Sequence, residues 1–230
     1  MDSGARVAGS KLVAVIPAYN EAGHIGAVVH AVRQFADDVV VVDDGSSDAT
    51  GAEARAAGAR VYRHLVNRGL GGGLATGLRA ALRAGAEIIV TLDGDGQHVP
   101  SEVLDVAGPI RKGAADFVIG SRMLDPQGMP LSRRVANRLA NLCTWILFGV
   151  HVSDTQSGFR AFSRRVAESI DLRTSRMEVS SEIVAEVARH GFRIVEVPIT
   201  VIYTDYSLSK GQSLGVGLQT LVKLILRRSR

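Results

Sequence analysis

Cysteine, aromatic residues and long apolar runs are all scarce in this sequence. Cys143 is the only cysteine among 230 residues, so no disulfide can form within the chain, which favours a reducing compartment. Aromatic residues make up 5% of the chain, so its core must be largely aliphatic. The first ten residues are small and polar, and no stretch reaches the roughly 20 apolar residues of a membrane span. We therefore expect a cytoplasmic protein without a signal peptide or a membrane span.

Acidic side chains are absent from residues 207–230, although the net charge of the whole chain is only +4. This segment carries five basic residues: Lys210, Lys223, Arg227, Arg228 and Arg230. Leucines at helical spacing predict an amphipathic helix over residues 213–228. That helix can lie on an anionic membrane surface, or its apolar face can pack on the protein itself. Because only this basic end favours nucleic acid, we expect no nucleic-acid partner.

Short apolar runs and stretches of helical spacing alternate along the first half of the chain. The predicted strands span residues 11–16, 39–42, 59–62, 87–92, 116–119 and 194–202. The predicted helices span residues 21–35, 48–57, 72–84, 100–112, 131–148 and 179–190. Continuous apolar strands that alternate with helices indicate an α/β fold with a mostly parallel central sheet and helices on both faces. No linker divides the chain, so we expect one domain over residues 1–230.

Polar clusters follow three of the predicted strands. They lie at residues 17–21, 43–46 and 93–97, where the first, second and fourth strands end. Because ligands of parallel sheets bind at the carboxyl ends of the strands, we expect these three acidic loops to meet at one edge.

The third cluster carries the clearest chemistry. Asp93 and Asp95 follow a buried strand and are separated by a glycine, which allows close approach of a ligand. Gln97 adds another oxygen ligand, and His98 is a possible neighbour. Oxygen ligands of this kind suit Mg²⁺ or Mn²⁺, which proteins often share with substrate phosphates. An isolated pair of this spacing is a weak signal, but its place after a buried strand strengthens it.

The other two polar segments admit simpler interpretations. Asp43 and Asp44 can bind a nucleotide base or ribose, or they can pair with basic residues of the protein. Asp48 is more simply a helix N-cap than a ligand. Residues 67–73 are rich in glycine but lack both dinucleotide-binding and P-loop spacing, so they are best interpreted as a flexible turn before the next helix.

Six motifs in order identify a family. They are PAYNE (17–21), VVVDDGSSDAT (40–50), NRGLGGGLATG (67–77), TLDGDGQH (91–98), GSR (120–122) and DTQSGFRAF (154–162). Together they strongly resemble glycosyltransferase family 2, and within it the dolichyl- or polyprenyl-phosphate sugar synthases. The resemblance runs from about residue 12 to residue 210, and it implies a GT-A fold and a divalent metal.

The resemblance also implies roles for individual residues. The nucleotide would be bound by Pro17, Tyr19, Glu21, Asp43 and Asp44. The metal and the diphosphate would be bound by Asp93, Asp95 and Gln97. Catalysis would involve Asp93 and Asp95 together with Arg122 and Lys210, the latter as a clamp on the diphosphate. The acceptor phosphate would be bound by Arg133, Arg134 and Asn137.

One departure from the family concerns the acceptor. The polyprenyl-phosphate synthases usually have an arginine and a glycine where this chain has Thr204 and Ser207, while Lys210 is retained.

The expected reaction is metal-dependent displacement with inversion, from a nucleotide diphosphate sugar to a polyprenyl phosphate, which is anionic and needs no base. The expected location is the inner face of the membrane, as a peripheral protein with a possible membrane-protein partner.

Two alternatives remain open at this point. The first is transfer to a hydroxyl acceptor, which needs a carboxylate base such as Asp154, Glu178 or Glu182. The second is a catalytically silent subunit that binds nucleotide sugar and regulates a membrane partner, which the intact acidic loops argue against.

Overall fold

A seven-stranded sheet organises the part of the chain that the computed structural model describes, residues 9–126, 129–174 and 178–202. Its strand order is β3-β2-β1-β4-β6-β5-β7, and every neighbouring pair is parallel except those that involve β6. The strands are β1 (Leu12–Ala18), β2 (Asp38–Asp43), β3 (Arg60–Arg63), β4 (Ile88–Thr91), β5 (Phe117–Ser121), β6 (Arg160–Ser163) and β7 (Ile194–Pro198). The predicted α/β fold with a mostly parallel sheet is confirmed.

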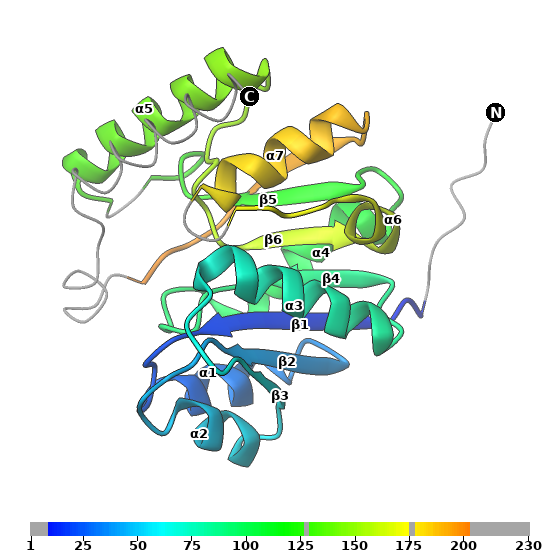
Figure 1. Ribbon diagram of the computed structural model, residues 1–230. Helices are drawn as coiled ribbons and strands as arrows, with labels where there is room; N and C mark the ends of the chain where they lie inside the picture. Colours follow the sequence, from blue (N-terminus) through cyan, green and yellow to red (C-terminus); the bar gives the residue numbers. More distant parts are fainter. Residues whose placement is uncertain (1–8, 127–128, 175–177, 203–230) are drawn as a thin grey trace.

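Helices cover both faces of this sheet (Figure 1), because the strands alternate apolar side chains between two buried clusters. Leu12, Ala14 and Ile16 of β1 face one cluster, while Val13 and Val15 face the other. The first cluster is covered by α1 (Ile25–Val32), α2 (Thr50–Ala56) and α4 (Val103–Arg111), which follows the 3₁₀ turn η1 (Pro100–Glu102). The second is covered by α3 (Gly69–Arg83), α6 (Arg164–Ser169) and α7 (Val179–Arg189).

Helix α3 packs closely on the sheet and begins earlier than the sequence pattern predicts. A Cβ at Gly77 would lie 2.2 Å from Cγ1 of Val15, so the helix approaches β1 to a distance that only glycine permits. Residues 69–73 belong to the first turns of α3, so the prediction of a flexible turn there was wrong. The helix starts early because the Asp44 side chain accepts hydrogen bonds from the backbone N–H groups of Arg68 and Gly69.

Strand β6 was not predicted from the sequence. It pairs antiparallel with β4, with Thr91 opposite Arg160, and antiparallel with β5, with Ile119 opposite Arg160. Because it runs against its neighbours, its beginning lies at the edge where β1, β2 and β4 end. The segment that leads into β6, residues 154–159, is thereby brought to the same edge as the acidic loops.

Helix α5 (Leu131–Phe148) has the predicted bounds but little burial. Thr144 is its only buried residue, and the helix lies beside the body of the fold (Figure 1). Six of its large apolar side chains are substantially exposed: Leu131 76%, Val135 54%, Leu139 55%, Leu142 45%, Trp145 51% and Ile146 63%. The apolar stripe seen in the sequence therefore has no cover among the described residues.

Two remaining expectations concern the end of the chain and membrane spans. Strand β7 ends at Pro198, and Val201 then forms an isolated antiparallel bridge with His98. The predicted helix over residues 213–228 lies outside the described residues. Among the helices that are described, none combines the length and apolar character needed to cross a membrane.

Candidate active site

The three acidic loops meet at one edge of the sheet, as predicted. β1 is parallel to β2, with Ala18 opposite Asp43, and on its other side it is parallel to β4. The ends of these strands therefore point the same way. The loops after β1 and β2 are also bonded to each other, because the backbone N–H of Asn20 donates to Ser46 Oγ and that of Glu21 donates to Thr50 Oγ1.

Asp93 lies at the start of the loop that follows β4 and is held on two sides. Its Oδ2 atom is 3.2 Å from Nε2 of His98, whose side chain is 5% exposed. On another side a Cβ at Gly158 would lie 2.5 Å from Oδ1 of Asp93, so any larger residue there would displace the Asp93 carboxylate. Partial burial raises the pKa of Asp93, but the hydrogen bond from His98 and the charges of His98, Arg122 and Arg160 outweigh it and lower the pKa.

Asp95 has the opposite electrostatic character. Burial and the neighbouring charge of Asp93 both raise its pKa, although hydrogen bonds from Gln97 oppose the shift. The Gln97 backbone N–H donates to Oδ1 at 3.1 Å, and the side-chain amide of Gln97 donates to Oδ2. Two carboxylates that repel each other in this way would be stabilised by a cation between or beside them.

The acidic loop fits a divalent metal that is shared with a substrate. Among the described residues, no group of three or more His, Cys, Asp or Glu side chains converges as a complete metal site. Asp93 and Asp95 could hold an Mg²⁺ or Mn²⁺ ion only together with oxygens from elsewhere. Proteins bind Mg²⁺ in this manner, through one or two carboxylates plus the phosphates of a substrate.

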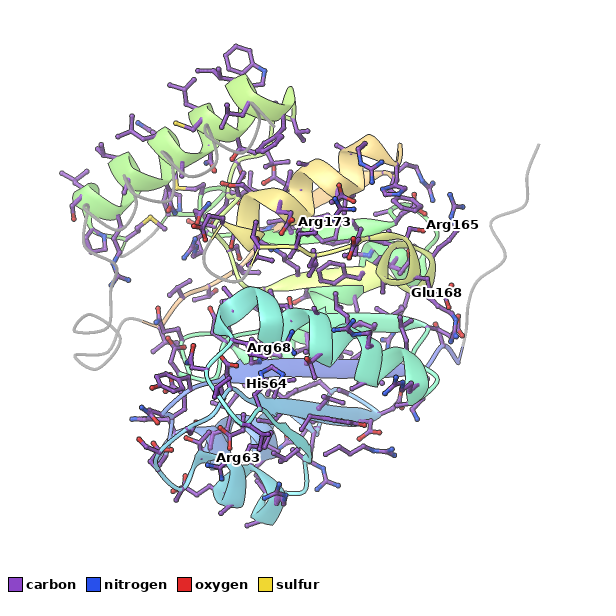
Figure 2. All side chains as sticks on the ribbon, viewed as in Figure 1. Arg63, His64, Arg68, Arg165, Glu168 and Arg173 are labelled. Carbon is purple, nitrogen blue, oxygen red and sulfur yellow. The ribbon has the colours of Figure 1, made fainter. Side chains whose placement is uncertain are left out.

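The two carboxylates at the end of β2, Asp43 and Asp44, are engaged by other groups of the protein, among them Arg63 and His64 (Figure 2). Oδ1 of Asp44 is 2.6 Å from Nδ1 of His64, and the Asp44 side chain also accepts the two backbone hydrogen bonds at the start of α3. Asp43 is fully buried, where its Oδ1 accepts a hydrogen bond from the backbone N–H of Ser46 and its Oδ2 lies 3.5 Å from Nε of Arg63. These contacts shape the loops of the site, and nucleotide binding by Asp43 and Asp44 stays a prediction.

Three further residues in or near the loops after β1 and β2 can be compared with their predicted roles. Tyr19 is 47% exposed beside these loops, where its ring is accessible to a ligand, and Pro17 lies within β1. Asp48 is not the N-cap of α2, since that position is Ala49. Its Oδ1 accepts from the Thr50 backbone N–H at 3.0 Å, and its Oδ2 accepts from Ala22 N–H at 3.1 Å, so it joins the two loops.

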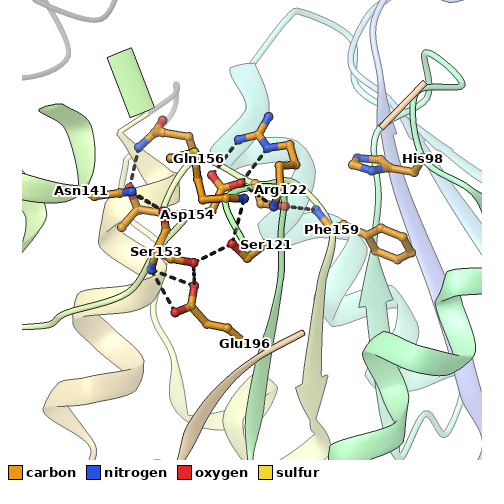
Figure 3. Close-up of polar contacts among 12 residues, drawn as sticks. His98, Ser121, Arg122, Asn141, Ser153, Asp154, Gln156, Phe159 and Glu196 are labelled. Atoms are coloured by element: carbon orange, nitrogen blue, oxygen red, sulfur yellow. Dashed lines mark hydrogen bonds and ion pairs between the residues drawn. The ribbon is translucent and has the colours of Figure 1, made fainter. Parts of the chain in front are cut away.

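Arg122 lies at the end of β5 and is clamped by Asp154. Its Nε and Nη2 atoms each donate to one carboxylate oxygen of Asp154 at 2.7 Å, and its backbone N–H donates at 3.1 Å (Figure 3). Asp154 is fully buried. A two-pronged pair of this kind fixes the plane of the guanidinium. The charge of Arg122 helps to lower the pKa of Asp93, so the clamp and the acidic loop interact electrostatically.

The structure argues against two of the three carboxylates considered as a base. Asp154 is buried, and both of its carboxylate oxygens accept hydrogen bonds from the Arg122 guanidinium, so it is not placed to take a proton from a substrate. Glu182 accepts hydrogen bonds from the backbone N–H groups of Arg173 and Thr174, and therefore holds a loop. Glu178 is 7% exposed and lies at the start of α7.

A polar network joins α5 to the end of β5 (Figure 3). Ser153 Oγ is 2.6 Å from Ser121 Oγ and donates at 2.6 Å to Glu196 Oε1. Asn141 of α5 accepts hydrogen bonds from both the backbone N–H and the hydroxyl of Thr155, at 2.9 and 2.8 Å. These contacts attach an otherwise exposed helix to the segment that carries Asp154. The sequence pattern gave no indication of this network.

The residues expected at the acceptor phosphate lie on the first turns of α5. Nη2 of Arg134 donates to the carbonyl of Pro126, which ties this guanidinium to the loop before the helix. Arg133 and Asn137 are partly exposed on the same helix. Lys210, the expected diphosphate clamp, lies outside the described residues, as do Thr204 and Ser207.

Comparisons with known proteins agree with this arrangement. The family model described as glycosyl transferase family 2 matches residues 13–171. A UDP-N-acetylglucosamine–dolichyl-phosphate N-acetylglucosaminyltransferase from Methanococcus voltae is 35% identical, over 92% of this chain and 94% of the relative. A polyprenol monophosphomannose synthase from Mycolicibacterium smegmatis is 36% identical, over 87% of this chain and 80% of the relative. Glucosyl-3-phosphoglycerate synthase from Mycobacterium tuberculosis, solved with Mn²⁺, UDP-glucose and phosphoglyceric acid, is 23% identical, with a TM-score of 0.73 over 96% of this chain and 80% of that one.

The mostly parallel sheet, the acidic loop after β4 and the likeness to that solved structure define a GT-A fold. The chain belongs to glycosyltransferase family 2 and is a glycosyltransferase. Its expected resemblance to the polyprenyl-phosphate sugar synthases is confirmed by the relatives from Methanococcus voltae and Mycolicibacterium smegmatis.

Proposed function

We propose that this enzyme transfers a sugar from a nucleotide diphosphate to a polyprenyl phosphate, with inversion at the anomeric carbon and with Mg²⁺ or Mn²⁺ bound. The observation that carries the proposal is the pair of carboxylates, Asp93 and Asp95, on a strand-end loop that lies beside the Arg122–Asp154 clamp. Such a pair needs a cation, and a guanidinium nearby suits phosphate oxygens. The names of two relatives, one acting on dolichyl phosphate and one making polyprenol monophosphomannose, support the acceptor.

The donor half of the mechanism rests on the acidic loop. A bound divalent ion would stabilise the charge that develops on the leaving diphosphate. Asp93 and Asp95 would hold that ion, and Gln97 keeps Asp95 in place through its two hydrogen bonds. The exposed ring of Tyr19 and the bonded loops after β1 and β2 would bind the nucleoside. Glu21 would contribute from the same loop.

The acceptor half needs no proton transfer. An oxygen of the lipid phosphate would attack the anomeric carbon as the bond to the nucleotide diphosphate breaks, and this oxygen is already anionic at neutral pH. The engagement of Asp154 and Glu182 in other contacts supports a reaction without a carboxylate base. Arg122 would orient phosphate oxygens near the acidic loop, and Arg133, Arg134 and Asn137 would bind the acceptor phosphate from α5.

We also propose that the enzyme works as a peripheral protein at the inner face of the membrane, where a lipid-linked acceptor is found. The exposed apolar stripe of α5, with Arg133 and Arg138 beside it, supports this location. A helix with one apolar and one basic face can lie in the interface of an anionic membrane. A membrane-protein partner remains part of the same proposal.

The test is transfer of radiolabelled sugar from a panel of nucleotide sugars to polyprenyl phosphate, with and without Mn²⁺ or Mg²⁺. The Asp95→Asn variant removes one metal-ligating charge and keeps the side-chain shape, so it should lose transfer. Asp105→Ala, which removes an exposed carboxylate from α4, is the matched control and should retain it.

Metal-dependent lipid product that disappears only in Asp95→Asn would support the proposal. Product on a hydroxyl acceptor, with none on polyprenyl phosphate, would overturn the acceptor half. Donor binding without any transfer would indicate a silent subunit, and the absence of donor binding would overturn the proposal as a whole.

A further inference from the structure

The segment Asp154–Arg160, here called the 154–160 turn, touches both halves of the site. At its beginning, Asp154 clamps Arg122. Near its end, Gly158 lies directly against the carboxylate of Asp93. The main chain of the turn is bonded to two strands, because Gly158 O accepts from Thr91 Oγ1 at 2.9 Å and Phe159 O accepts from Gly120 N–H at 2.8 Å. The turn therefore bridges the end of β4 and the end of β5.

Arg160 holds this turn from behind. Arg160 is only 2% exposed, and among the described residues it is the largest of the fully buried side chains. Its Nη2 atom donates to the carbonyl of Thr155 at 2.7 Å, within the turn, and to the carbonyl of Ser180 at 3.3 Å, on α7. A single guanidinium thus joins the turn to the helix that packs behind it.

The charge of Arg160 is costly where it lies. None of the described carboxylates forms a direct ion pair with Arg160, and its buried Nε has no hydrogen-bond partner among the described residues. Burial lowers the pKa of Arg160 to about 10, although the charges of Asp154 and Asp93 oppose the shift. An apolar side chain of similar volume would avoid the cost of burying an unpaired charge. A buried guanidinium at this position therefore calls for a role beyond packing.

We propose that Arg160 is a positioning residue that fixes the 154–160 turn and thereby sets Asp93 and Arg122 relative to each other. This inference rests on the proposed function, in which Asp93 binds the metal and Arg122 orients phosphate oxygens. Neither of these residues is in hydrogen-bonding contact with Arg160 among the described contacts. Arg160 acts on Asp93 through Gly158 and on Arg122 through Asp154.

The substitution Arg160→Met tests this role, because it keeps an unbranched side chain and removes the fork. The Thr155 and Ser180 carbonyls lose their common donor, so the turn should shift against both β4 and β5. Loss of a residue that orients metal ligands typically costs 10- to 100-fold in metal affinity or activity. We expect a loss in that range for Mn²⁺ affinity and for kcat, with a smaller change in KM for the donor.

Arg160→Lys provides the conservative comparison. An ammonium keeps the charge but cannot reproduce the planar fork that reaches two carbonyls. This variant should bind Mn²⁺ more tightly than Arg160→Met and at least about threefold more weakly than the wild type, if Arg160 acts as proposed. It also decides the question if Arg160→Met fails to fold.

Phe162→Leu is the matched control for a purely structural effect. Phe162 is fully buried on the same strand and packs its ring 4.9 Å from that of Phe117, away from the turn. This variant should lose thermal stability, because a smaller side chain leaves a cavity. Its Mn²⁺ affinity and kcat should remain those of the wild type at temperatures where it is folded.

The measurement is titration of the full chain with Mn²⁺, followed by electron paramagnetic resonance, in the presence of UDP and separately of GDP. Steady-state transfer and thermal unfolding are recorded for the same samples. Weaker Mn²⁺ binding by both Arg160 variants, together with wild-type Mn²⁺ affinity in Phe162→Leu, supports the proposal. Wild-type Mn²⁺ affinity in the Arg160 variants overturns it while the proposed function stands. No Mn²⁺ binding by the wild type with either nucleotide overturns the proposed metal site itself, and with it the role of Arg160.

Discussion

Replacing Gly158 with alanine should displace Asp93 and little else. The added Cβ would lie 2.5 Å from Oδ1, 2.7 Å from Oδ2 and 2.8 Å from Cγ of Asp93. Gly158 is not among the glycines with a positive φ, so alanine fits its backbone without strain. The atoms in the way are the far end of a side chain, which can rotate, and not backbone. The substitution therefore moves one carboxylate and leaves the sheet in place.

The size of the effect follows from this geometry. The carboxylate must retreat from 2.5 Å to an ordinary contact distance of 3.4 Å or more. Metal–oxygen bonds of about 2.0–2.1 Å leave little tolerance for such a shift, and a misplacement of about 1 Å can cost on the order of 100-fold in rate. A 100-fold loss corresponds to about 2.7 kcal/mol of transition-state stabilisation.

Transfer of radiolabelled sugar to polyprenyl phosphate at saturating donor would measure this loss, with thermal unfolding recorded beside it. Gly108→Ala is the matched control, because a Cβ at Gly108 on α4 meets nothing within 4 Å. We expect Gly158→Ala to unfold at nearly the wild-type temperature and to transfer sugar about 100-fold more slowly. Activity within about threefold of the wild type would show that the metal does not depend on the position of Asp93, and would refute this reasoning.

Two further predictions concern other parts of the molecule. The double substitution of Leu139 and Ile146 by glutamate should weaken binding to phosphatidylglycerol vesicles at least tenfold in a sedimentation assay, because each apolar side chain contributes about 1.5–3 kcal/mol when buried. Leu104→Glu, at an exposed leucine of α4, should bind vesicles as the wild type does, and equal binding by all three proteins would exclude α5 from the membrane. Partial burial raises the pKa of Asp116, but the hydrogen bonds and charge of Arg193 outweigh it and lower the pKa. The Asp116–Arg193 pair should therefore stabilise the fold above about pH 4, and this contribution should be lost as the pH falls through the lowered pKa. The unfolding free energy of Asp116→Asn should therefore fall less steeply between about pH 4 and pH 2 than that of the wild type, and identical slopes would contradict this assignment.

Sequence patterns predict the buried first half of this fold because each element there follows a single period. Strands β1 and β2 lie between helices on both faces, so every residue of Val39–Val42 is buried and the run is continuously apolar. Strand β6 lacks that signal. It is only four residues long, begins with Arg160 and ends with Ser163, and reads as part of a polar motif. Its place between β4 and β5 depends on pairings with distant residues that no local period records.

Residue types predict the acidic side chains of the site but not how each is used. Asp93 and Asp44 both follow buried strands, and the sequence does not show which neighbouring groups bond to each carboxylate. Asp44 is nevertheless engaged by His64 and by backbone N–H groups, while Asp93 remains 46% exposed. That difference arises from the path of the chain after β3, which brings His64 to Asp44. Hydrogen bonds between loops depend on such paths and leave little trace in composition or spacing.

Strand β6 ties completion of the site to a late stage of folding. During synthesis β4 is finished at Thr91, but its antiparallel neighbour is not available until Ser163 has been made. Until then β4 is an unpaired edge, and closing it requires a slow pairing between distant segments. The same step seats Gly158 against Asp93 and delivers Asp154 to Arg122. A partly folded chain can thus already have the loops after β1 and β2, yet it lacks the contacts that hold Asp93 and Arg122 in place.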